Sequence, residues 1–229
     1  PPTSRRSLRV HLYGADIRPD APLAQWYRSI GITDVWLYPV KGAFVQDQLP
    51  HTQNTVRDLQ NERVLEAYRK RNISYWWFER PVPDYFYVRA KTRAFPAEHV
   101  WDSTPRTERL WRDLCRNIRR VYGAVRRAGF EGIVYDNEAY YSYGVVRKDA
   151  DLPWVWAGHE AQTGPAGNYY RRGMQVGRAI AEVWPDAKVI MVYAFGYEPE
   201  RWWYQGIHDG GVDLILGPEH TYGAGPREN

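Results

Sequence analysis

Apolar and polar positions along this chain follow two periods, one typical of strands and one typical of helices. Short apolar runs rich in β-branched and aromatic residues predict strands. Six stretches have this pattern, at 8–15, 33–40, 73–78, 132–136, 188–195 and 212–216. Longer stretches with apolar residues three and four apart predict helices. Five stretches have that pattern, at 22–31, 57–72, 107–128, 169–184 and 199–208.

The ends of the predicted helices carry residues that suit those positions. The helix at 22–31 has Pro22 in its first turn and Gly31 at its end. Gly129 follows the longest helix, at 107–128. One apolar stripe runs along this longest helix, through Leu110, Leu114, Ile118, Val121 and Val125.

Strands that alternate with helices predict an α/β protein with a parallel sheet. The length of each unit and the long loops at 79–105 and 139–168 favour a (β/α)8 barrel of the TIM type over a doubly wound sheet. Six strands are fewer than the eight of that barrel. Three explanations are open: strands hidden in the loops, an incomplete barrel, or a chain cut after its sixth strand. We expect a linker at 1–7 and a single barrel domain at 8–229.

Composition excludes several classes of protein. The only cysteine is Cys115, so neither an intrachain disulfide nor a cysteine-based zinc site is expected. No apolar run reaches the roughly 20 residues of a membrane-spanning helix. The net charge of +4 comes mostly from arginine, without a zinc-finger, RNP or leucine-zipper pattern. We therefore expect no nucleic-acid and no membrane partner. We expect a secreted or extracellular protein, with the cytoplasm as the alternative.

Polar side chains gather where the predicted strands end. They are Asp16, Tyr38, Glu79, Asp136, Glu138, Tyr193 and Glu219. In a barrel of parallel strands, the residues that do the chemistry lie at these carboxyl ends. For Asp16, Glu79 and Glu219, a solvated loop position is an equally good interpretation of each residue taken singly.

Asp136 and Glu138 form the strongest signal, because two carboxylates follow a short apolar strand two residues apart. Residues i and i+2 of a strand point to the same side, so both would face the barrel mouth if Val134 faces the interior. Two close carboxylates cannot both ionise freely, and the raised pKa of one makes it a proton donor near neutral pH. Glycosidic bond cleavage needs such an acid. The alternative is a capping Asp beside a salt-bridged Glu.

The segment G-F-E-G-I-V-Y-D-N-E resembles the fourth strand of chitinase-type family 18 glycoside hydrolases, in which a G-F-D-G lead-in runs into D-x-D-x-E. The matching residues are Gly129, Phe130, Gly132, Asp136 and Glu138. Glu131 and Val134 depart from the pattern, since both positions usually hold Asp. The resemblance covers about ten residues. The pair Asn137-Glu138 also resembles the Asn-Glu at the fourth strand of the large retaining-glycosidase clan.

The resemblance implies that Glu138 is the proton donor and that Asp136 orients an acetamido group of the substrate, which attacks the anomeric carbon. The run Met191-Val192-Tyr193 is similar to the M-x-Y of that family, which makes Tyr193 a candidate to assist that group. Because Val134 stands where that pattern has Asp, a substrate without an acetamido group remains open. A water or a second carboxylate, from Glu219 or Glu79, would then attack.

The aromatic content fits a sugar substrate, with 11 Trp and 18 Tyr against 6 Phe. Sugar rings stack on Trp and Tyr, which also carry a polar group. We expect Trp36 and Trp76 to pack in the core. The candidate substrate-binding residues are Asp16, Tyr38, Trp77, Glu79, Tyr140, Tyr141, Trp154 and Trp156.

Other chemistries find little support. The chain lacks H-E-x-x-H, G-x-S-x-G and the glycine-rich phosphate motifs, so no metal and no cofactor are expected. The sequence therefore predicts a glycoside hydrolase acting on a polysaccharide. Two alternatives remain open: a non-catalytic carbohydrate-binding barrel, and a barrel lyase or isomerase that holds a small anion with Arg and Lys.

Overall fold

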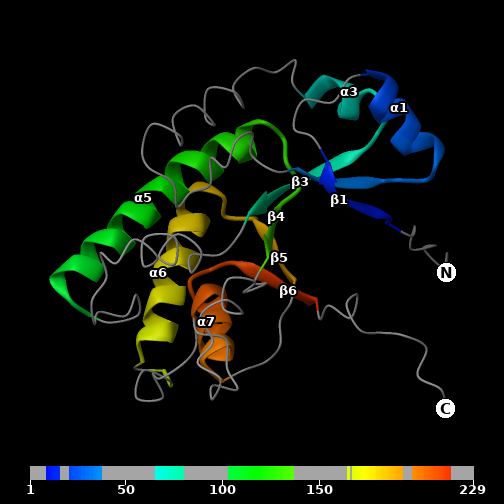
Figure 1. Ribbon diagram of the computed structural model, residues 1–229. Coiled ribbons are helices and arrows are strands. Elements are labelled where there is room, and N and C mark those ends of the chain that lie inside the picture. The colour runs from blue at the N-terminus through cyan, green and yellow to red at the C-terminus, as the bar shows by residue number, and fades with distance from the viewer. Residues whose placement is uncertain are drawn as a thin grey trace, which may run out of the picture.

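The computed structural model describes residues 9–15, 21–37, 65–79, 103–136, 164–165, 167–192 and 198–217. Strands and helices alternate along them (Figure 1). In chain order they are β1 (His11–Ala15), α1 (Ala21–Ser29), β2 (Asp34–Leu37), α3 (Glu66–Arg69), β3 (Ser74–Glu79), α5 (Pro105–Arg127), β4 (Ile133–Asp136), α6 (Asn168–Val183), β5 (Lys188–Val192), α7 (Glu198–Asp209) and β6 (Asp213–Gly217). Each predicted strand and helix has a counterpart among the described residues. Of the helix predicted at 57–72, the structure describes residues 65–72, in which α3 covers Glu66–Arg69.

The strands form one parallel sheet in the order β1-β2-β3-β4-β5-β6, so each strand pairs with its neighbours in sequence. Parallel neighbours need a crossover connection, and a helix supplies it between each pair. Within the described residues β1 and β6 are the two edges of the sheet, which is not closed. The predicted α/β class and parallel sheet are thus confirmed, while the closed eight-stranded barrel stays a prediction.

The five described helices pack against one face of the sheet, which we call the helix face. Their apolar residues join alternate strand residues in one large core. The strand residues of this core include Val35, Leu37, Tyr75, Trp77, Ile133, Tyr135, Val189 and Met191. A doubly wound sheet has helices on both faces. A sheet with sequential strand order and one helical layer is instead singly wound, as the strands of a βα-barrel are.

The opposite face of the sheet, which we call the inner face, carries the intervening strand residues. Trp76, Phe78 and Val134 form a second, smaller apolar cluster. Partly buried Trp36, Ile190 and Val192 pack against it. The inner face belongs to strand residues alone, because in the described part of the chain no helical residue joins this cluster.

Helix α5 is longer than the strands that it covers. Its 23 residues span about 34 Å, whereas the six residues of β3 span about 20 Å. The C-terminal end of α5 is fixed near the start of β3, where the Tyr75 hydroxyl donates to the Ala128 carbonyl at 3.0 Å. The first half of α5 therefore extends past the carboxyl edge of the sheet (Figure 1). No described helix is long and apolar enough to cross a membrane.

Helix α5 begins at Pro105, two residues before the predicted start. Thr104 caps the helix: its side chain accepts from the Thr107 amide at 3.2 Å, and the Thr107 hydroxyl accepts from the Thr104 amide at 3.0 Å. Proline suits the first turn, because that turn has no intrahelical partner for an amide. Four stripe residues, Leu114, Ile118, Val121 and Val125, are buried as the sequence predicts.

Helices α6 and α7 approach each other backbone to backbone. Gly173 and Gly177 on α6 face Gly206 on α7 and Gly210, the residue directly after α7. A methyl group added to Gly177 would lie 2.2 Å from the Ile207 carbonyl oxygen. Four glycines therefore set how closely these helices pack.

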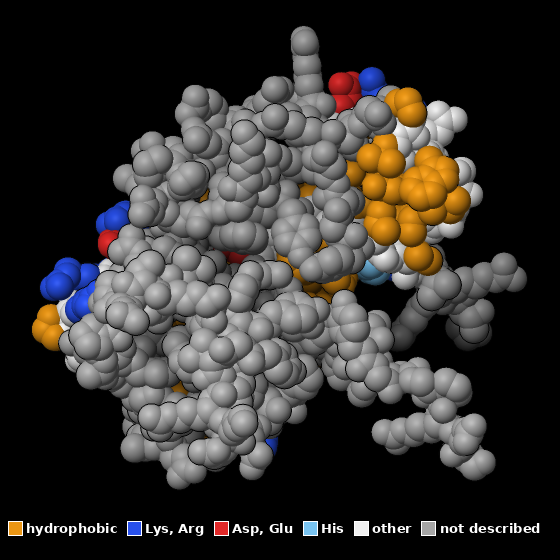
Figure 2. All heavy atoms as spheres, in the orientation of Figure 1, with side chains coloured by type: hydrophobic (Ala, Val, Ile, Leu, Met, Phe, Trp, Pro, Cys, Tyr) orange, Lys and Arg blue, Asp and Glu red, His pale blue; other side chains and the backbone are white. Residues whose placement is uncertain are grey.

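Elsewhere, apolar side chains reach the surface over α1, where Trp26 and Ile30 are about half exposed (Figure 2).

Candidate functional site

The candidate site lies at the carboxyl edge of the parallel sheet, where all six strands end together. In sequence, Asp16, Tyr38 and Tyr193 directly follow β1, β2 and β5, and Glu138 and Glu219 come two residues after β4 and β6. These five residues lie outside the described residues, as do Tyr140, Tyr141, Trp154 and Trp156. Among the predicted site residues, the structure describes Trp77, Glu79 and the backbone of Asp136.

Asp136 is the last residue of β4 and pairs in register with Val192 of β5. Strand residues alternate between the two faces of a sheet. Ile133 and Tyr135 belong to the helix-face core, and Val134 belongs to the inner face. Position 136 therefore falls on the inner face. Val134 lies on the face away from the helices, which is the face that a closed barrel would turn to its interior.

Aromatic side chains occupy the inner face on the amino-terminal side of residue 136. Trp36 and Phe78 stack with ring centroids 6.0 Å apart and planes 19° apart. Trp76 is almost fully buried beside Gly132, where a side-chain carbon would lie 2.5 Å from its ring. Trp36 and Trp76 thus pack in the smaller apolar cluster, as predicted. The inner face below the carboxyl edge is therefore apolar and largely aromatic.

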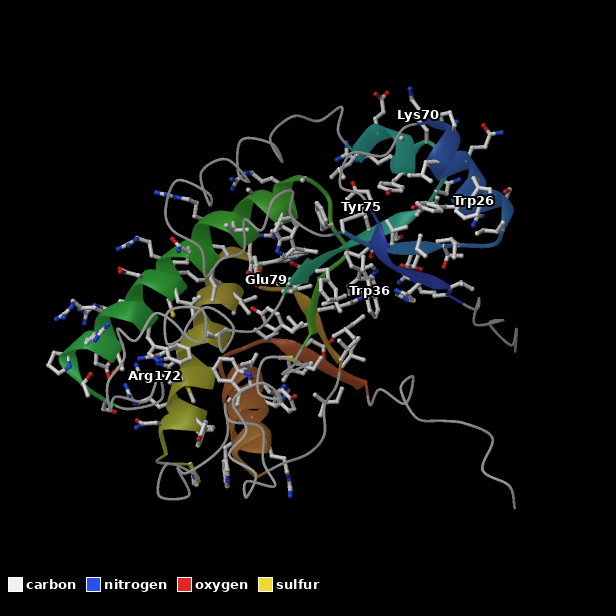
Figure 3. All side chains as sticks on the ribbon, viewed as in Figure 1. Trp26, Trp36, Lys70, Tyr75, Glu79 and Arg172 are labelled. Carbon is white, nitrogen blue, oxygen red and sulfur yellow. The ribbon has the colours of Figure 1, made fainter. Side chains whose placement is uncertain are left out.

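Glu79 ends β3 on the other side of the sheet. It follows Tyr75 and Trp77 in the alternation and is fully buried against α5 (Figure 3). Its Oε2 accepts from the Trp77 indole at 3.0 Å and from the Tyr122 hydroxyl at 2.7 Å. The prediction that Glu79 binds substrate, or attacks the sugar in place of an acetamido group, placed it with the other carboxylates. The structure corrects this, because the Glu79 side chain is fully buried on the helix face, where Tyr122 of α5 donates to it.

A second hydroxyl extends this buried contact. The oxygens of Tyr122 and Tyr135 lie 2.7 Å apart. The single hydroxyl proton of Tyr122 goes to Glu79, so Tyr135 donates to Tyr122. Burial, and then the charge of Glu79, raise the pKa of both tyrosines well above the usual range, so both stay protonated donors. Tyr135, Tyr122 and Glu79 form what we call the tyrosine chain. It links β4 to the end of β3 through α5.

Trp77 was predicted to bind substrate and lies instead in the helix-face core. Its side chain is fully buried, and Phe130 packs edge-on against it at 5.8 Å between ring centroids. A sugar could stack on this ring only by displacing the core. Trp77 therefore serves Glu79 as a donor, and we do not assign it a substrate contact.

At the opposite, amino-terminal end of the strands, a polar network surrounds the buried carboxylate of Asp34. Arg9 pairs with both of its oxygens, and the Thr33 hydroxyl and Trp76 indole donate to it at 2.7 and 2.9 Å. These donors lower the pKa of Asp34 although burial opposes them. His11 Nε2 lies 4.0 Å from the carboxylate. The network joins three strands at the end away from the candidate site.

Helices α5 and α6 are joined near their first turns by a partly buried ion pair. Glu108 accepts from Arg172 at 2.8 and 2.9 Å and from Arg171 at 3.0 Å. Arg172 is fully buried, and its guanidinium lies 5.1 Å from the centre of the Trp111 ring (Figure 3). Helix starts lie at the carboxyl edge of the sheet. The pair therefore fixes the two helices that follow β3 and β4.

Sequence reasoning missed the tyrosine chain and the Asp34 network. Tyr122 was detectable as a neighbour of the apolar stripe of α5, and a buried tyrosine usually finds a partner for its hydroxyl. The role of Asp34 was not detectable, because a single Asp at the start of a strand is commonplace. Among the described residues, no cluster of His, Cys, Asp and Glu could hold a metal ion.

A pocket of about 620 Å³ between α7 and β6, lined by Trp202, His208 and Leu216 among others, opens on the helix side of the sheet.

No protein-family model and no curated protein sequence matches this chain. Among solved structures, the virulence factor SghA from Agrobacterium tumefaciens is 11% identical with a TM-score of 0.43, and the match covers 75% of this chain and 35% of that one. A GH18 chitinase from Pseudoalteromonas aurantia is 7% identical with a TM-score of 0.38, covering 90% and 67%. The chain thus spans about a third and two thirds of their lengths. A likeness this slight carries no argument, so function is inferred from the chain itself.

Proposed function

We propose that this chain is a glycoside hydrolase that cleaves the glycosidic bonds of a polysaccharide, with Glu138 as general acid and Asp136 as its partner. One observation supports the proposal: β4 ends with Asp136 at the carboxyl edge, two residues after Val134, which lies on the face away from the helices. The proposal extends the strand alternation by one step, from Asp136 to Glu138. It also takes the singly wound sheet as part of a (β/α)8 barrel, in which this edge holds the active site.

The chemistry follows from the proximity of two carboxyl groups. Ionisation of Asp136 disfavours ionisation of Glu138, which keeps Glu138 protonated nearer to neutral pH. A protonated Glu138 donates its proton to the leaving glycosidic oxygen as the bond to the anomeric carbon breaks. Asp136 then orients the group that attacks this carbon or holds the proton of Glu138 in place.

Neighbouring strands supply the other proposed members of the site. Val192 pairs with Asp136, so Tyr193 follows at the adjacent strand end and is proposed to assist the attacking group. Glu219 is proposed as the second carboxylate, which attacks if the substrate lacks an acetamido group. With Glu79 buried on the helix face, Glu219 is the remaining carboxylate proposed for that role, and a water is the other candidate. The remaining proposed substrate contacts are Asp16, Tyr38, Tyr140, Tyr141, Trp154 and Trp156.

Reducing-end release from neutral, amino-sugar and acidic polysaccharides tests the proposal. The parent should cleave one class, and Glu138→Gln should lower its rate by about 10²-fold or more, as on losing a general acid. Glu131→Gln is the matched control, because it makes the same chemical change at an exposed residue just before β4. Its rate should equal that of the parent.

The outcomes separate the competing functions. Equal cleavage by the parent and Glu138→Gln would remove Glu138 from the chemistry and overturn the proposal. Glycan binding without cleavage in either protein would favour a carbohydrate-binding module. Turnover of a small anion, with no dependence on polymer length, would favour a lyase or isomerase.

A further inference from the structure

We propose that the tyrosine chain is a positioning device, in which Tyr122 holds the carboxyl ends of β3 and β4 in the geometry that the candidate carboxylates require. The inference rests on the proposed function for its effect on rate. Its structural part, the fixing of the two strand ends, stands on the geometry alone. None of the three residues is assigned a contact with substrate.

The first step of the argument is connectivity. Glu79 and Tyr135 are register partners on neighbouring strands, and both side chains lie on the helix face. Tyr122 of α5 bridges them, with both oxygen–oxygen distances at 2.7 Å. A single side chain from the helix therefore ties the last residue of β3 to the residue that precedes Asp136.

The second step concerns the stiffness of this link. Glu79 and Tyr122 are fully buried and Tyr135 is 4% exposed, so water does not compete for these hydrogen bonds. Opening one of them would leave a buried polar group without its partner, which costs far more than a bond at the surface. The Trp77 indole donates a hydrogen bond to the same Glu79 oxygen at 3.0 Å, which fixes the Glu79 end of the tyrosine chain.

The third step is the position of the chain relative to the site. Tyr135 and position 136 are consecutive, and alternation places them on opposite faces of β4. A tilt of the Tyr135 backbone therefore displaces Asp136 directly. Hydrolysis depends steeply on such displacements, since an error of about 1 Å can cost about 10²-fold in rate. A device on the helix face can thus control geometry on the inner face without touching the substrate.

The fold offers a matched control at the other end of β3. Tyr75 is also a buried tyrosine on the helix face, and its hydroxyl donates to the Ala128 carbonyl at 3.0 Å and accepts from Arg69 Nε at 2.8 Å. Tyr75→Phe and Tyr122→Phe each remove one buried hydroxyl that has two partners. They differ in which end of the strand they release (Figure 3).

Two measurements on Tyr122→Phe and Tyr75→Phe test the inference. Amide hydrogen exchange should show a loss of protection of about tenfold at Tyr135 and Asp136 in Tyr122→Phe, as expected for local opening, and no change there in Tyr75→Phe. On the polysaccharide that the parent cleaves, Tyr122→Phe should lower kcat by roughly 10- to 100-fold with KM nearly unchanged, and Tyr75→Phe should keep the parent kcat. The urea midpoints of the two variants should fall by similar amounts.

Glu79→Gln separates geometry from charge, because the amide keeps an oxygen that can accept from Tyr122 and Trp77. Positioning predicts that its kcat stays close to that of the parent and that the pH profile does not move. A shifted pH profile would overturn the inference in favour of a charge effect. Equal exchange and equal kcat in Tyr122→Phe and Tyr75→Phe would also overturn it, while leaving the proposed function standing. A parent without hydrolase activity, combined with selective loosening at Asp136 in Tyr122→Phe, would support the link and refute the proposed function.

Discussion

Two substitutions of glycine by alanine should have opposite effects on stability, although both lie inside helices. Gly177 on α6 and Gly123 on α5 are both buried, and alanine favours a helix over glycine by about 1 kcal/mol. The tertiary contacts differ. A methyl group at Gly177 would lie 2.2 Å from the Ile207 carbonyl oxygen and 3.0 Å from the Gly210 α-carbon. At Gly123 the nearest atom is the flexible end of Arg127, at 3.5 Å.

The magnitude follows from what must move. At Gly177 the obstacle is the backbone of α7, so the helices must separate by about an ångström, and overpacking of this kind costs typically 1–3 kcal/mol and sometimes more. We take the upper end because backbone cannot rotate away as a side chain can. After the helix gain of about 1 kcal/mol, Gly177→Ala should lose about 2 kcal/mol. Gly123→Ala meets only ordinary contacts and should gain about 0.5–1 kcal/mol.

Urea unfolding followed by circular dichroism and tryptophan fluorescence measures both changes. The midpoint should fall for Gly177→Ala and rise for Gly123→Ala at an unchanged slope, since the surface exposed on unfolding is the same. In thermal unfolding, Tm should drop by roughly 4–8 °C and rise by roughly 1–4 °C respectively. A Gly177→Ala protein as stable as the parent would refute the close α6–α7 packing. Destabilisation of both variants alike would refute the attribution to tertiary contact.

Two further predictions concern charged groups. The pKa values of Asp34 and His11 are lowered from their ordinary values of 3.8 and 6.5, so the folded state disfavours protonation of both. The stabilisation from both groups is complete above those values and is lost as the pH falls, so the urea midpoint should decline below about pH 6.5 and again below about pH 4. Asp34→Asn should make the second decline smaller without removing it, because the hydrogen bonds from Arg172 also lower the pKa of Glu108, whose protonation adds to that decline. At the α5–α6 ion pair, Glu108→Leu should lower the free energy of unfolding by about 3–5 kcal/mol, because it removes the carboxylate that pairs with the buried Arg172 cation. Arg172→Met should cost less, because Glu108 is 29% exposed and still pairs with Arg171. Equal losses in urea unfolding would contradict this asymmetry.

Local patterns were enough to predict the elements of this protein, because periodicity and end signals act within a few residues. The six strands, the five helices and the parallel α/β class all followed from spacing, and α5 was off by two residues only where Thr104 and Pro105 extend its first turn. The sequence also predicted that Asp136 ends a strand, because a charged residue after the apolar run Ile133-Val134-Tyr135 marks the end of a buried strand. The closed barrel and the roles of Glu138, Tyr193 and Glu219 stay predictions.

Only the tertiary structure decided which face of the sheet each polar residue occupies. Alternation pairs Glu79 with Trp77 and Asp136 with Val134, but the sequence does not say which of these faces the helices cover. The partners that settle it are distant along the chain: Tyr122 lies 43 residues from Glu79, and Trp76 lies 42 residues from Asp34. Such contacts form only when the strands and helices have packed. The physical reason is that local sequence sets backbone conformation, whereas the burial of a carboxylate depends on donors that the fold brings to it.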